Sequence, residues 1–468
     1  MERLIKTGEI KAKNSKDIKE SKMGLGFEKL DRDAFDPSQC YEKIAKLGVK
    51  WARIQSGWAK TEKQNGVYDF KWLDDVVDNL IANGLKPWLC LCYGNGLYSE
   101  MAKKIFGAVG VAPIFDEESK QAWANYVRAT VKHYRGRIDT FEVWNEPDGE
   151  WCWKTGVNAT ELGEFTVCTS KIIKQENKDA YIIGGVFCKR ELSFINEALA
   201  AGMGDYIDAI SFHEYSSDER GVTERVSGLR GLCSLYNKNI EIIQGESGSQ
   251  SRSGGSGAVW TGCWTQRKQA KQLLRHAMID LKADVKFTSY FSCMDMREAL
   301  NGVEGDPESY KDFGYFGVLG ADFDENGIAT GEYKEKLSYR ALQTISSIFC
   351  EDVKICDLPV ILTPKESARI FDKDLSANDI IYQGFKKPNG SYAYVYWAPT
   401  DIMTSDFEST ISLQAVYKGD DIKIVDLMDG SIYKLPEDMY EKDSFGVYQI
   451  NNLPVKDYPM LIMFGDFE

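Results

Sequence analysis

FEVWNEPDGEW, residues 141–151, is the stretch from which the fold can be worked out. Residues 139–145 predict a buried β-strand, and the strand ends at Pro147, which cannot donate a ladder hydrogen bond and restricts the residue before it. Glu146 therefore stands at the carboxyl end of an apolar strand, in a loop that also contains Trp151. A single loop glutamate is usually exposed to solvent, so this stretch alone does not define a site.

A second stretch, IEIIQGESGSQ at residues 240–250, has the same form. It predicts another buried strand that ends in a carboxylate, Glu246, and is followed by a loop of glycine and serine. Two carboxylates at the same ends of two strands are what the cleavage of a glycosidic bond requires. Glu146 and Glu246 are therefore the first candidates for a catalytic pair.

Strands and helices alternate eight times from residue 23 onward, which is typical of parallel strands joined by crossover helices. Eight such units predict an α/β fold, a closed (β/α)8 TIM barrel over residues 23–349. A doubly wound sheet is the alternative, but no G-x-G-x-x-G follows the first strand and no phosphate-binding loop is found. The predicted strands are 23–28, 50–55, 87–93, 139–145, 181–187, 207–213, 240–246 and 285–291, and the helix expected after the last of them is 333–348.

The predicted secondary structure changes after residue 349, from alternating strands and helices to strands alone. Short β-type runs follow one another, separated by turn signals at Pro388-Asn389-Gly390 and Asp429-Gly430. Residues 350–468 therefore predict a second domain, an antiparallel β-sandwich. Residues 1–22 are a candidate for one further strand of this sandwich.

Composition limits the possible partners and locations. The chain has 468 residues and a net charge of −14, which argues against binding to nucleic acid or to an anionic membrane surface. No run reaches the ~18–20 apolar residues of a membrane span. The first 22 residues are charged and lack the apolar core of a signal peptide, and the 11 cysteines contain no C-x-x-C pair. These features predict a cytoplasmic protein with reduced thiols.

Barrels of this kind carry their active sites at the carboxyl ends of the strands. Arg53 lies on strand two, and alternation on strand seven predicts that Ile242, Gln244 and Glu246 share one side. An arginine inside an apolar strand is costly to bury without a carboxylate partner. Glu246 is the candidate partner, and the pairing would keep it ionised, as a nucleophile must be. An ion pair between Arg53 and Glu28 is the alternative.

Strands four and six supply the other candidate side chains. Burial of Glu146 beside Trp144 would favour the protonated form that a general acid needs. Glu142 lies on the same side of strand four and is expected to be a buried, paired carboxylate. His213 and Tyr215 share one side at the end of strand six, although a hydrogen-bonded core histidine is an alternative role for His213.

The motif WNEP at residues 144–147, together with Glu246 on strand seven, resembles the clan A glycoside hydrolases. Arg53 on strand two and the His-x-Tyr at residues 213–215 match the pattern of this clan. The order LGVKWARIQSGW, YDFKWLDDVVDNLIANGLKPWL and FEVWNEP, followed by a β-sandwich, most resembles glycoside hydrolase family 39, the β-xylosidase and α-L-iduronidase family. The resemblance covers the barrel and, more loosely, the sandwich.

The resemblance implies a retaining double displacement. Glu246 would attack the anomeric carbon while Glu146 protonates the leaving oxygen, and Glu146 would then activate water to release the sugar. The two carboxyl groups would then lie about 5–5.5 Å apart. The resemblance also implies roles in substrate binding. Asn145 would bond the sugar 2-hydroxyl, and Arg53 would orient Glu246. His213 and Tyr215 would line the site on the side of the nucleophile.

One feature departs from the family pattern. Strand eight of such enzymes usually carries a tryptophan beneath the bound sugar, whereas this chain has Tyr290 and Phe291 there. Phe291 is therefore the candidate floor of the sugar site. Trp260 and Trp264, after the Gly/Ser loop of strand seven, are candidates for a second platform, the alternative being that they pack the loop onto the barrel.

We therefore expect a retaining glycosidase that acts on short oligosaccharides or glycosides from the non-reducing end, without a cofactor or metal. A non-catalytic carbohydrate-binding barrel is the rival from another class. A metal-dependent hydrolase is a second rival, but the sequence does not assemble a ligand cluster around His133, His213 and His276. The sugar is not identified by these motifs, and a homo-oligomer is compatible with them.

Overall fold

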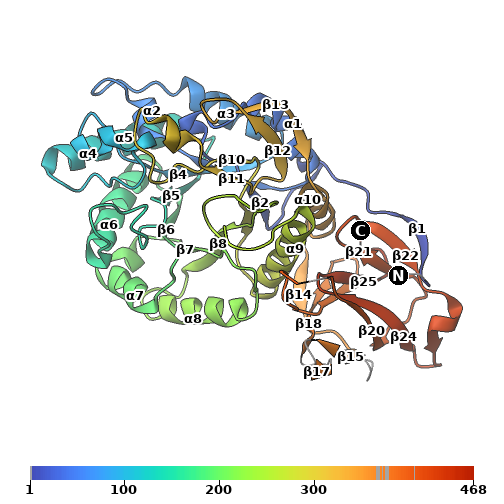
Figure 1. The fold of residues 1–468 in the computed structure, drawn as a ribbon. Coiled ribbons are helices and arrows are strands. Elements are labelled where there is room, and N and C mark those ends of the chain that lie inside the picture. The colour runs from blue at the N-terminus through green and yellow to red at the C-terminus, as the bar shows by residue number, and fades with distance from the viewer. Residues whose placement is uncertain (1–2, 365–368, 371–372, 375–378, 405, 468) are drawn as a thin grey trace.

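The computed structural model describes residues 3–364, 369–370, 373–374, 379–404 and 406–467. Its larger part is a closed barrel of eight parallel strands, in which each strand pairs with the next one along the chain and β9 pairs with β2. This confirms the predicted (β/α)8 barrel (Figure 1). The barrel strands are β2 (Met23–Gly26), β3 (Trp51–Gln55), β4 (Lys86–Leu91), β5 (Thr140–Val143), β6 (Tyr181–Phe187), β7 (Ala209–His213), β8 (Glu241–Ser247) and β9 (Thr288–Tyr290).

Helices surround the barrel, and their apolar sides pack against its strands (Figure 1). Two short helices, α2 (Trp58–Thr61) and α4 (Glu100–Lys104), belong to the loops after β3 and β4. The main helices are α1 (Tyr41–Lys46), α3 (Lys71–Ala82), α5 (Glu117–Tyr134), α6 (Ala159–Glu176), α7 (Leu192–Ala200), α8 (Val222–Ser234), α9 (Gln266–Lys282) and α10 (Leu337–Ile348).

The connection between β9 and α10 forms two small hairpins. They pair β10 (Met296–Arg297) with β11 (Phe313–Gly314), and β12 (Leu319–Phe323) with β13 (Ala329–Glu335). The prediction that the last helix begins at residue 333 is therefore wrong. Tyr333 belongs to β13, where it is fully buried, and this tertiary packing outweighs its apparent helical spacing.

An apolar cluster fills the amino-terminal half of the barrel. Its members come from β4, β6, β7, β8 and the residue before β9, and they are Trp88, Ile183, Ala209, Ile243 and Phe287. Because this half is packed with side chains, a ligand can reach the barrel axis only from the carboxyl ends of the strands.

Strand β8 has one extra residue, Gly245, at the point where its pairing with β7 shifts register. Such a bulge changes which side chains face the barrel axis. Ile243 packs in the inner apolar cluster, yet Glu246 also faces the cavity at the top of the barrel. The prediction that Ile242, Gln244 and Glu246 share one side is therefore wrong, because strict alternation requires an unbroken strand.

The second part of the chain is a sandwich of antiparallel sheets. The larger sheet has the order β1-β22-β21-β25-β19-β18-β14, and the smaller has the order β15-β20-β24-β23. A short hairpin pairs β16 (Arg369–Ile370) with β17 (Lys373–Asp374). The strands are β1 (Ile5–Glu9), β14 (Lys354–Cys356), β15 (Val360–Pro364), β18 (Ile381–Lys386), β19 (Tyr392–Trp397), β20 (Glu408–Val416), β21 (Ile422–Asp426), β22 (Ser431–Lys434), β23 (Tyr440–Lys442), β24 (Val447–Lys456) and β25 (Met460–Phe464).

Both ends of the chain lie in the sandwich. Strand β1 forms an edge of the larger sheet by antiparallel pairing with β22, and β25 lies inside the same sheet. Figure 1 shows the two termini on the same side of the molecule, away from the barrel. The chain therefore begins in the sandwich, forms the barrel and then returns to the sandwich.

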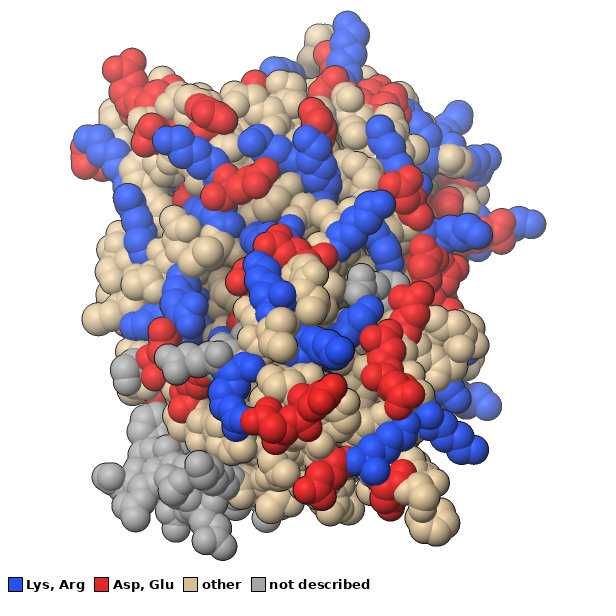
Figure 2. Space-filling view, turned by 90° about the vertical axis from the view of Figure 1, so that its right-hand side faces the viewer, with Lys and Arg blue, Asp and Glu red and all other residues tan. Residues whose placement is uncertain are grey.

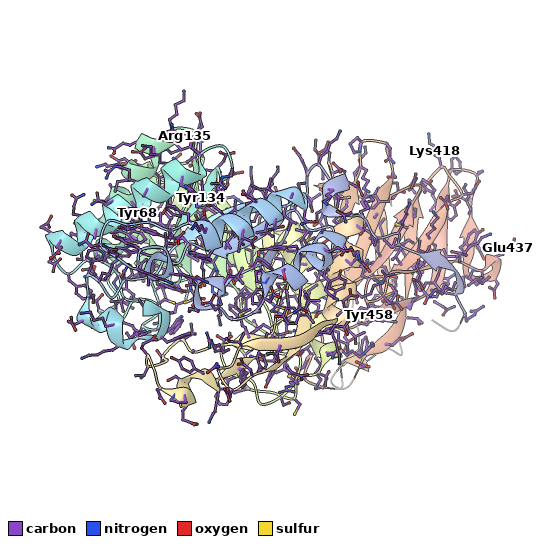
Figure 3. All side chains as sticks on the ribbon, turned by 90° about the horizontal axis from the view of Figure 1, so that it is seen from above. Tyr68, Tyr134, Arg135, Lys418, Glu437 and Tyr458 are labelled. Atoms are coloured by element: carbon purple, nitrogen blue, oxygen red, sulfur yellow. The ribbon has the colours of Figure 1, made fainter. Side chains whose placement is uncertain are left out.

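Helix α9 lies between the barrel and the sandwich. All of its residues from 269 to 281 are buried, although many of them are polar. Tyr458 of the sandwich lies on the side that faces the barrel (Figure 3), and its ring centre is 5.7 Å from the guanidinium of Arg267 on α9. The two parts of the molecule thus meet along a helix whose polar side chains need partners from both.

Basic and acidic side chains are interspersed on the face shown in Figure 2, without one large patch of a single sign. Among the helices of the described residues, none is both long and apolar enough to cross a membrane.

Candidate active site

A cavity of about 420 Å³ opens at the carboxyl ends of the barrel strands, a volume within the usual range for small-molecule sites. The structure brings most of the predicted site residues to this cavity. Those that line it are Asn145, Glu146, His213, Tyr215, Glu246 and Phe291. Arg53 lies directly beneath them and has no solvent exposure.

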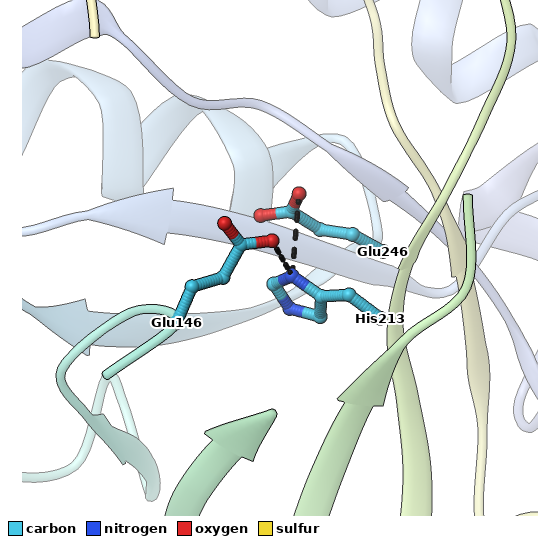
Figure 4. Close-up of side chains that lie close together, drawn as sticks. All are labelled: Glu146, His213 and Glu246. Carbon is cyan, nitrogen blue, oxygen red and sulfur yellow. Dashed lines mark hydrogen bonds and ion pairs between the residues drawn. The ribbon is translucent and has the colours of Figure 1, made fainter. Parts of the chain in front are cut away.

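The two candidate carboxylates meet at one nitrogen of His213 (Figure 4). His213 Nδ1 lies 2.7 Å from Glu146 Oε1 and 3.5 Å from Glu246 Oε2. The three atoms all lie within 4.8 Å of one another. This spacing is close to the separation expected for two carboxylates that act on the same bond by a retaining mechanism, and shorter than the gap that inverting enzymes leave for water.

The backbone after β5 turns sharply so that Glu146 can reach the cavity. Trp144 has φ 66° and Glu146 has φ 44°, both in the left-handed region that residues other than glycine seldom adopt. The indole of Trp144 donates to the carbonyl of Cys152 at 2.7 Å, and the indole of Trp151 donates to Glu146 Oε2 at 2.5 Å. The tryptophans of this loop therefore hold a strained backbone and orient the glutamate, which is typical of functional sites.

Glu246 is held by hydrogen bonds on both oxygens. Tyr215 donates its hydroxyl to Oε2 at 2.6 Å, and the guanidinium of Arg53 donates to Oε1. Burial raises the pKa of this carboxyl, but the charges of His213 and Arg53 and the hydrogen bond from Tyr215 outweigh burial and lower it. Glu246 is therefore ionised at neutral pH, as a nucleophile must be.

Room for His213 depends on the bulge of β8. A Cβ atom on Gly245 would lie 2.3 Å from Ser211 Oγ and 3.2 Å from His213 Nε2. The glycine therefore lets β7 and β8 approach closely where the two strands present His213 and Glu246 to the cavity.

Arg53 donates hydrogen bonds to three buried carboxylates. They include Glu246 and Glu28, the two partners that the sequence analysis considered for it. Besides Glu246, it donates to Glu28 Oε1 at 2.8 Å and to Glu142 Oε1 at 2.9 Å through Nε. Burial, and then the charge of Glu246, raise the pKa of Glu28 to about 8, so Glu28 is largely protonated at neutral pH. Glu142 is the buried, paired carboxylate that the sequence predicted on strand four.

His213 is buried, and burial alone would lower its pKa. The charge of Glu246 and the hydrogen bond to Glu146 outweigh burial, so the pKa of His213 is raised above its ordinary value. The charge of His213 is in turn one of the factors that lower the pKa of Glu246. His213 is thus a buried, hydrogen-bonded histidine, as in the alternative considered for it, and its partners are the two candidate carboxylates.

Hydrogen bonds to both the oxygen and the nitrogen of its side-chain amide orient Asn145. Its Oδ1 accepts from Arg53 Nη2 at 2.8 Å, and its Nδ2 donates to the hydroxyl of Tyr93 at 3.0 Å. Tyr93 also lines the cavity and was missed by the sequence analysis. It lies just past β4, at the same end of the barrel as the other site residues, and that position was the signal that could have identified it.

An aromatic wall lies on the side of Glu246. Phe291 packs edge-on against Tyr215 and Phe316, with ring centres 6.1 Å and 5.4 Å apart. Phe316 comes from the long connection between β9 and α10, and the sequence carried no signal that this segment reaches the site.

Trp264 is the exception among the predicted site residues. It is buried outside the cavity, and its indole donates to the backbone carbonyls of Val259 and Thr261. These bonds hold the indole against its own segment of the chain, outside the cavity, so the substrate-binding role predicted for Trp264 is wrong. Trp260 is 63% exposed and does not line the cavity either.

Several charged residues of the cavity were missed because they lie in loops. Lys29 pairs with Glu298 at 3.0 Å, and Arg190 pairs with Glu214. Each of these two cations is thus balanced by a neighbouring carboxylate. Asp148 accepts three backbone N–H bonds from residues 188–190 and so fastens the loop of Glu146 to the loop that carries Arg190.

Glu146, His213 and Glu246 could also hold a divalent cation. One possible ligand atom from each residue lies within 4.8 Å of the other two. The sequence analysis did not anticipate a cluster around any of the three histidines, because His213 and the two glutamates are far apart in the chain. In this structure the three groups bond to one another.

Comparison with known proteins finds similar proteins among the glycoside hydrolases. Residues 40–228 match the family model described as Glycosyl hydrolases family 39, which confirms the resemblance predicted from the sequence. The matched segment contains Arg53, Glu146 and His213, and it ends before Glu246. A beta-xylosidase from Geobacillus stearothermophilus is 25% identical over 160 residues, an alignment that covers 32% of this chain and 31% of that protein.

Solved structures resemble the chain over almost its whole length. A family 39 glycoside hydrolase from Bacteroides cellulosilyticus WH2 superimposes with a TM-score of 0.66 at 17% identity, covering 95% of this chain and 80% of that one. A monomeric beta-xylosidase from Caulobacter crescentus CB15 gives a TM-score of 0.62 at 16% identity, covering 98% and 97% of the two chains. At these identities the likeness shows the fold, including the attached sandwich.

Proposed function

We propose that this chain is a retaining glycoside hydrolase that removes a terminal sugar from a short oligosaccharide or a glycoside. The observation that carries the proposal is the meeting of Glu146 and Glu246 at His213 Nδ1, with Glu246 held in its ionised form. The match to the family 39 model and the resemblance to a beta-xylosidase support it.

In the first step, Glu246 attacks the anomeric carbon while the carboxyl proton of Glu146 passes to the leaving oxygen. The bond to the leaving group breaks, and a covalent glycosyl ester forms on Glu246. In the second step, Glu146, now ionised, takes a proton from a water molecule. That water attacks the anomeric carbon and restores Glu246. Each glutamate therefore ends the cycle in the state in which it began.

The surrounding residues support these two steps. Arg53 and Tyr215 hold Glu246 as an anion before attack, and Asn145 is oriented to bond the sugar 2-hydroxyl. Phe291 and Phe316 provide an apolar wall for the C–H face of the sugar ring. A second cavity of about 430 Å³ shares Glu298 and residues 300–301 with the first and offers room for a leaving group.

The substrate is proposed to be a β-linked pentoside, on the model of the beta-xylosidase relatives. Removal of a terminal sugar is proposed by analogy with the beta-xylosidases that the chain resembles. A non-catalytic sugar-binding barrel is the alternative that the experiment below also tests.

The test uses wild type and Glu246→Gly with a panel of aryl β-glycosides and aryl α-L-arabinosides. We expect wild type to cleave a pentoside, the variant to be inactive, and azide to restore turnover with a glycosyl azide of inverted configuration. Azide replaces the missing carboxylate as the nucleophile, so rescue identifies the role of Glu246.

Glu241→Gly is the matched control, because Glu241 stands at the other end of β8 and pairs with Lys286 on the surface. This control should retain activity without azide. Full activity of Glu246→Gly without azide would contradict the assigned nucleophile. Binding of sugars by wild type without any cleavage would favour the binding-protein alternative.

A further inference from the structure

The sandwich contacts a loop of the active site. This loop, residues 214–221, follows His213 at the end of β7 and leads into α8. It contains Tyr215, which donates to Glu246, and Glu219, which has no solvent exposure. A buried carboxylate in a loop is costly unless its oxygens have partners, so the partners of Glu219 show what holds the loop.

One oxygen of Glu219 is bonded by the sandwich. The indole of Trp397, at the end of β19, donates to Glu219 Oε1 at 2.7 Å. The other oxygen is bonded by the barrel, because Arg275 of α9 donates from Nε to Oε2 at 2.7 Å. Arg275 itself donates from Nη1 to the carbonyl of Thr400, just past β19, at 2.8 Å.

A further hydrogen bond links the loop to α9. Gln272 of α9 donates to the backbone carbonyl of Ser216, the residue after Tyr215, at 3.3 Å. Trp397 and Arg275 are both fully buried, so water does not compete for these bonds. The loop is therefore fixed at two points by α9, and at one of them also by the sandwich.

These contacts link the sandwich to the nucleophile through a short path. Glu219 is bonded by Trp397, Glu219 belongs to the same short loop as Tyr215, and Tyr215 bonds Glu246. Buried charged groups of this kind have few alternative arrangements, because losing one partner leaves the other unpaired.

We infer that Trp397 of the β-sandwich is a positioning residue for the nucleophile, acting through Glu219 and the loop 214–221 on Tyr215. The sandwich is then a part of the catalytic machinery rather than a separate sugar-binding module. The inference rests on the proposed function for its kinetic consequence, but the restraint on the loop is a physical property that can be measured without a substrate.

The experiment compares Trp397→Phe with the neighbouring Tyr396→Phe. The second variant is the matched control, because the hydroxyl of Tyr396 is equally buried but donates within the sandwich, to the carbonyl of Pro454. Amide hydrogen exchange, read by mass spectrometry on peptides covering residues 214–221, measures the restraint on the loop directly.

In Trp397→Phe we expect faster exchange in this loop and a kcat about tenfold lower, the factor that corresponds to one hydrogen bond, with KM almost unchanged. Inactivation by a 2-deoxy-2-fluoro glycoside of the accepted sugar, which reports attack by Glu246, should slow by the same factor. Tyr396→Phe should leave the exchange of the loop, kcat and the inactivation rate at their wild-type values.

Unchanged exchange in Trp397→Phe would overturn the inference, and so would faster exchange with unchanged kcat. If Trp397→Phe does not fold, Glu219→Gln takes its place: its amide keeps one acceptor oxygen, so it must lose either the bond from Trp397 or the bond from Arg275, and the same measurements decide between these outcomes. If wild type cleaves no glycoside, the proposed function fails. The inference is then decided by the exchange data and by whether the bond between Tyr215 and Glu246 is lost in a crystal structure of Trp397→Phe.

Discussion

His213 is the residue at which the two carboxylates that we propose to be catalytic are coupled. Its Nδ1 contacts both of them, and its raised pKa results from their charges acting against its burial. A proton that moves onto or away from Glu146 therefore changes the field at Glu246, less than 5 Å away. In such a site the protonation states of the three groups belong to the cluster rather than to single residues.

Tyr215 should tune the acidity of the nucleophile. Its hydrogen bond is one of the factors that lower the pKa of Glu246, so Tyr215→Phe should raise that pKa. The acidic limb of the profile of kcat/KM against pH should then move upward by roughly one pH unit, because the ionised nucleophile is lost at a higher pH. Tyr290→Phe is the control, since Tyr290 is also buried, at the end of β9, but its hydroxyl does not bond Glu246. An acidic limb that stays in place in Tyr215→Phe would contradict this role.

Glu28 should make the stability of the protein depend on pH. Its pKa is about 8 in the folded chain and near 4.5 when unperturbed, so the folded state binds more protons between these values. Stability from this group is complete below the lower value and is lost as the pH rises through the upper one. Glu28→Gln should therefore show a smaller fall in melting temperature between about pH 5 and about pH 8 than wild type. The exposed Glu42→Gln should behave as wild type, and an equal fall in Glu28→Gln would contradict the raised pKa.

The irregular backbone of strand β8 helps to position the side chains of the site. Its bulge at Gly245 is the reason that Ile243 and Glu246 both face the barrel axis, and the bulge places the nucleophile beside His213. In the loop after β5, the left-handed backbone conformation of Trp144 likewise turns Glu146 toward the cavity. Both carboxylates are thus presented by irregular backbone at strand ends, where catalytic residues are commonly found.

Gly245→Ala should damage the site without unfolding the barrel. The added Cβ would lie 2.3 Å from Ser211 Oγ and 3.2 Å from His213 Nε2, so these side chains, or the strands that carry them, must shift. A displacement of about 1 Å in a catalytic group can reduce kcat about a hundredfold. Gly228→Ala in α8 is the control, because a Cβ there meets nothing within 4 Å, and it should stabilise the protein by about 0.5–1 kcal/mol. Wild-type kcat in Gly245→Ala would show that the bulge does not position the site.

The regular elements could be predicted from the sequence, whereas the irregular ones could not. Alternation and turn signals located the eight barrel strands, and with them Arg53, Glu146, His213 and Glu246. The bulge at Gly245 leaves no trace in a hydrophobic pattern, which is why the facing side chains of β8 were assigned wrongly. Lys29, Phe316 and Glu298 come from loops whose path depends on tertiary packing, and Trp264 was misassigned for the same reason.

At the scale of the whole molecule, the two parts share one interior. Buried apolar side chains of barrel and sandwich form a continuous cluster, and α9 is enclosed between them. Lys271 on this helix is almost fully buried and pairs with Asp457 of the sandwich at 2.6 Å. Without the sandwich this lysine would lose its carboxylate partner, and a buried charge that loses its partner is strongly destabilising.

The full chain should therefore unfold in a single cooperative transition. Differential scanning calorimetry is the measurement, and we expect one peak whose calorimetric and van't Hoff enthalpies agree. Lys271→Met should lower the midpoint of that peak as a whole, since it leaves Asp457 buried without its cation. The exposed Lys311→Met, which removes only a surface pair with Glu308, should leave the midpoint within about 1–2 °C of wild type. Two separate peaks, with only one of them shifted by Lys271→Met, would mean that barrel and sandwich fold independently. In that case the sandwich could not hold the active-site loop through a shared, cooperatively folded interior.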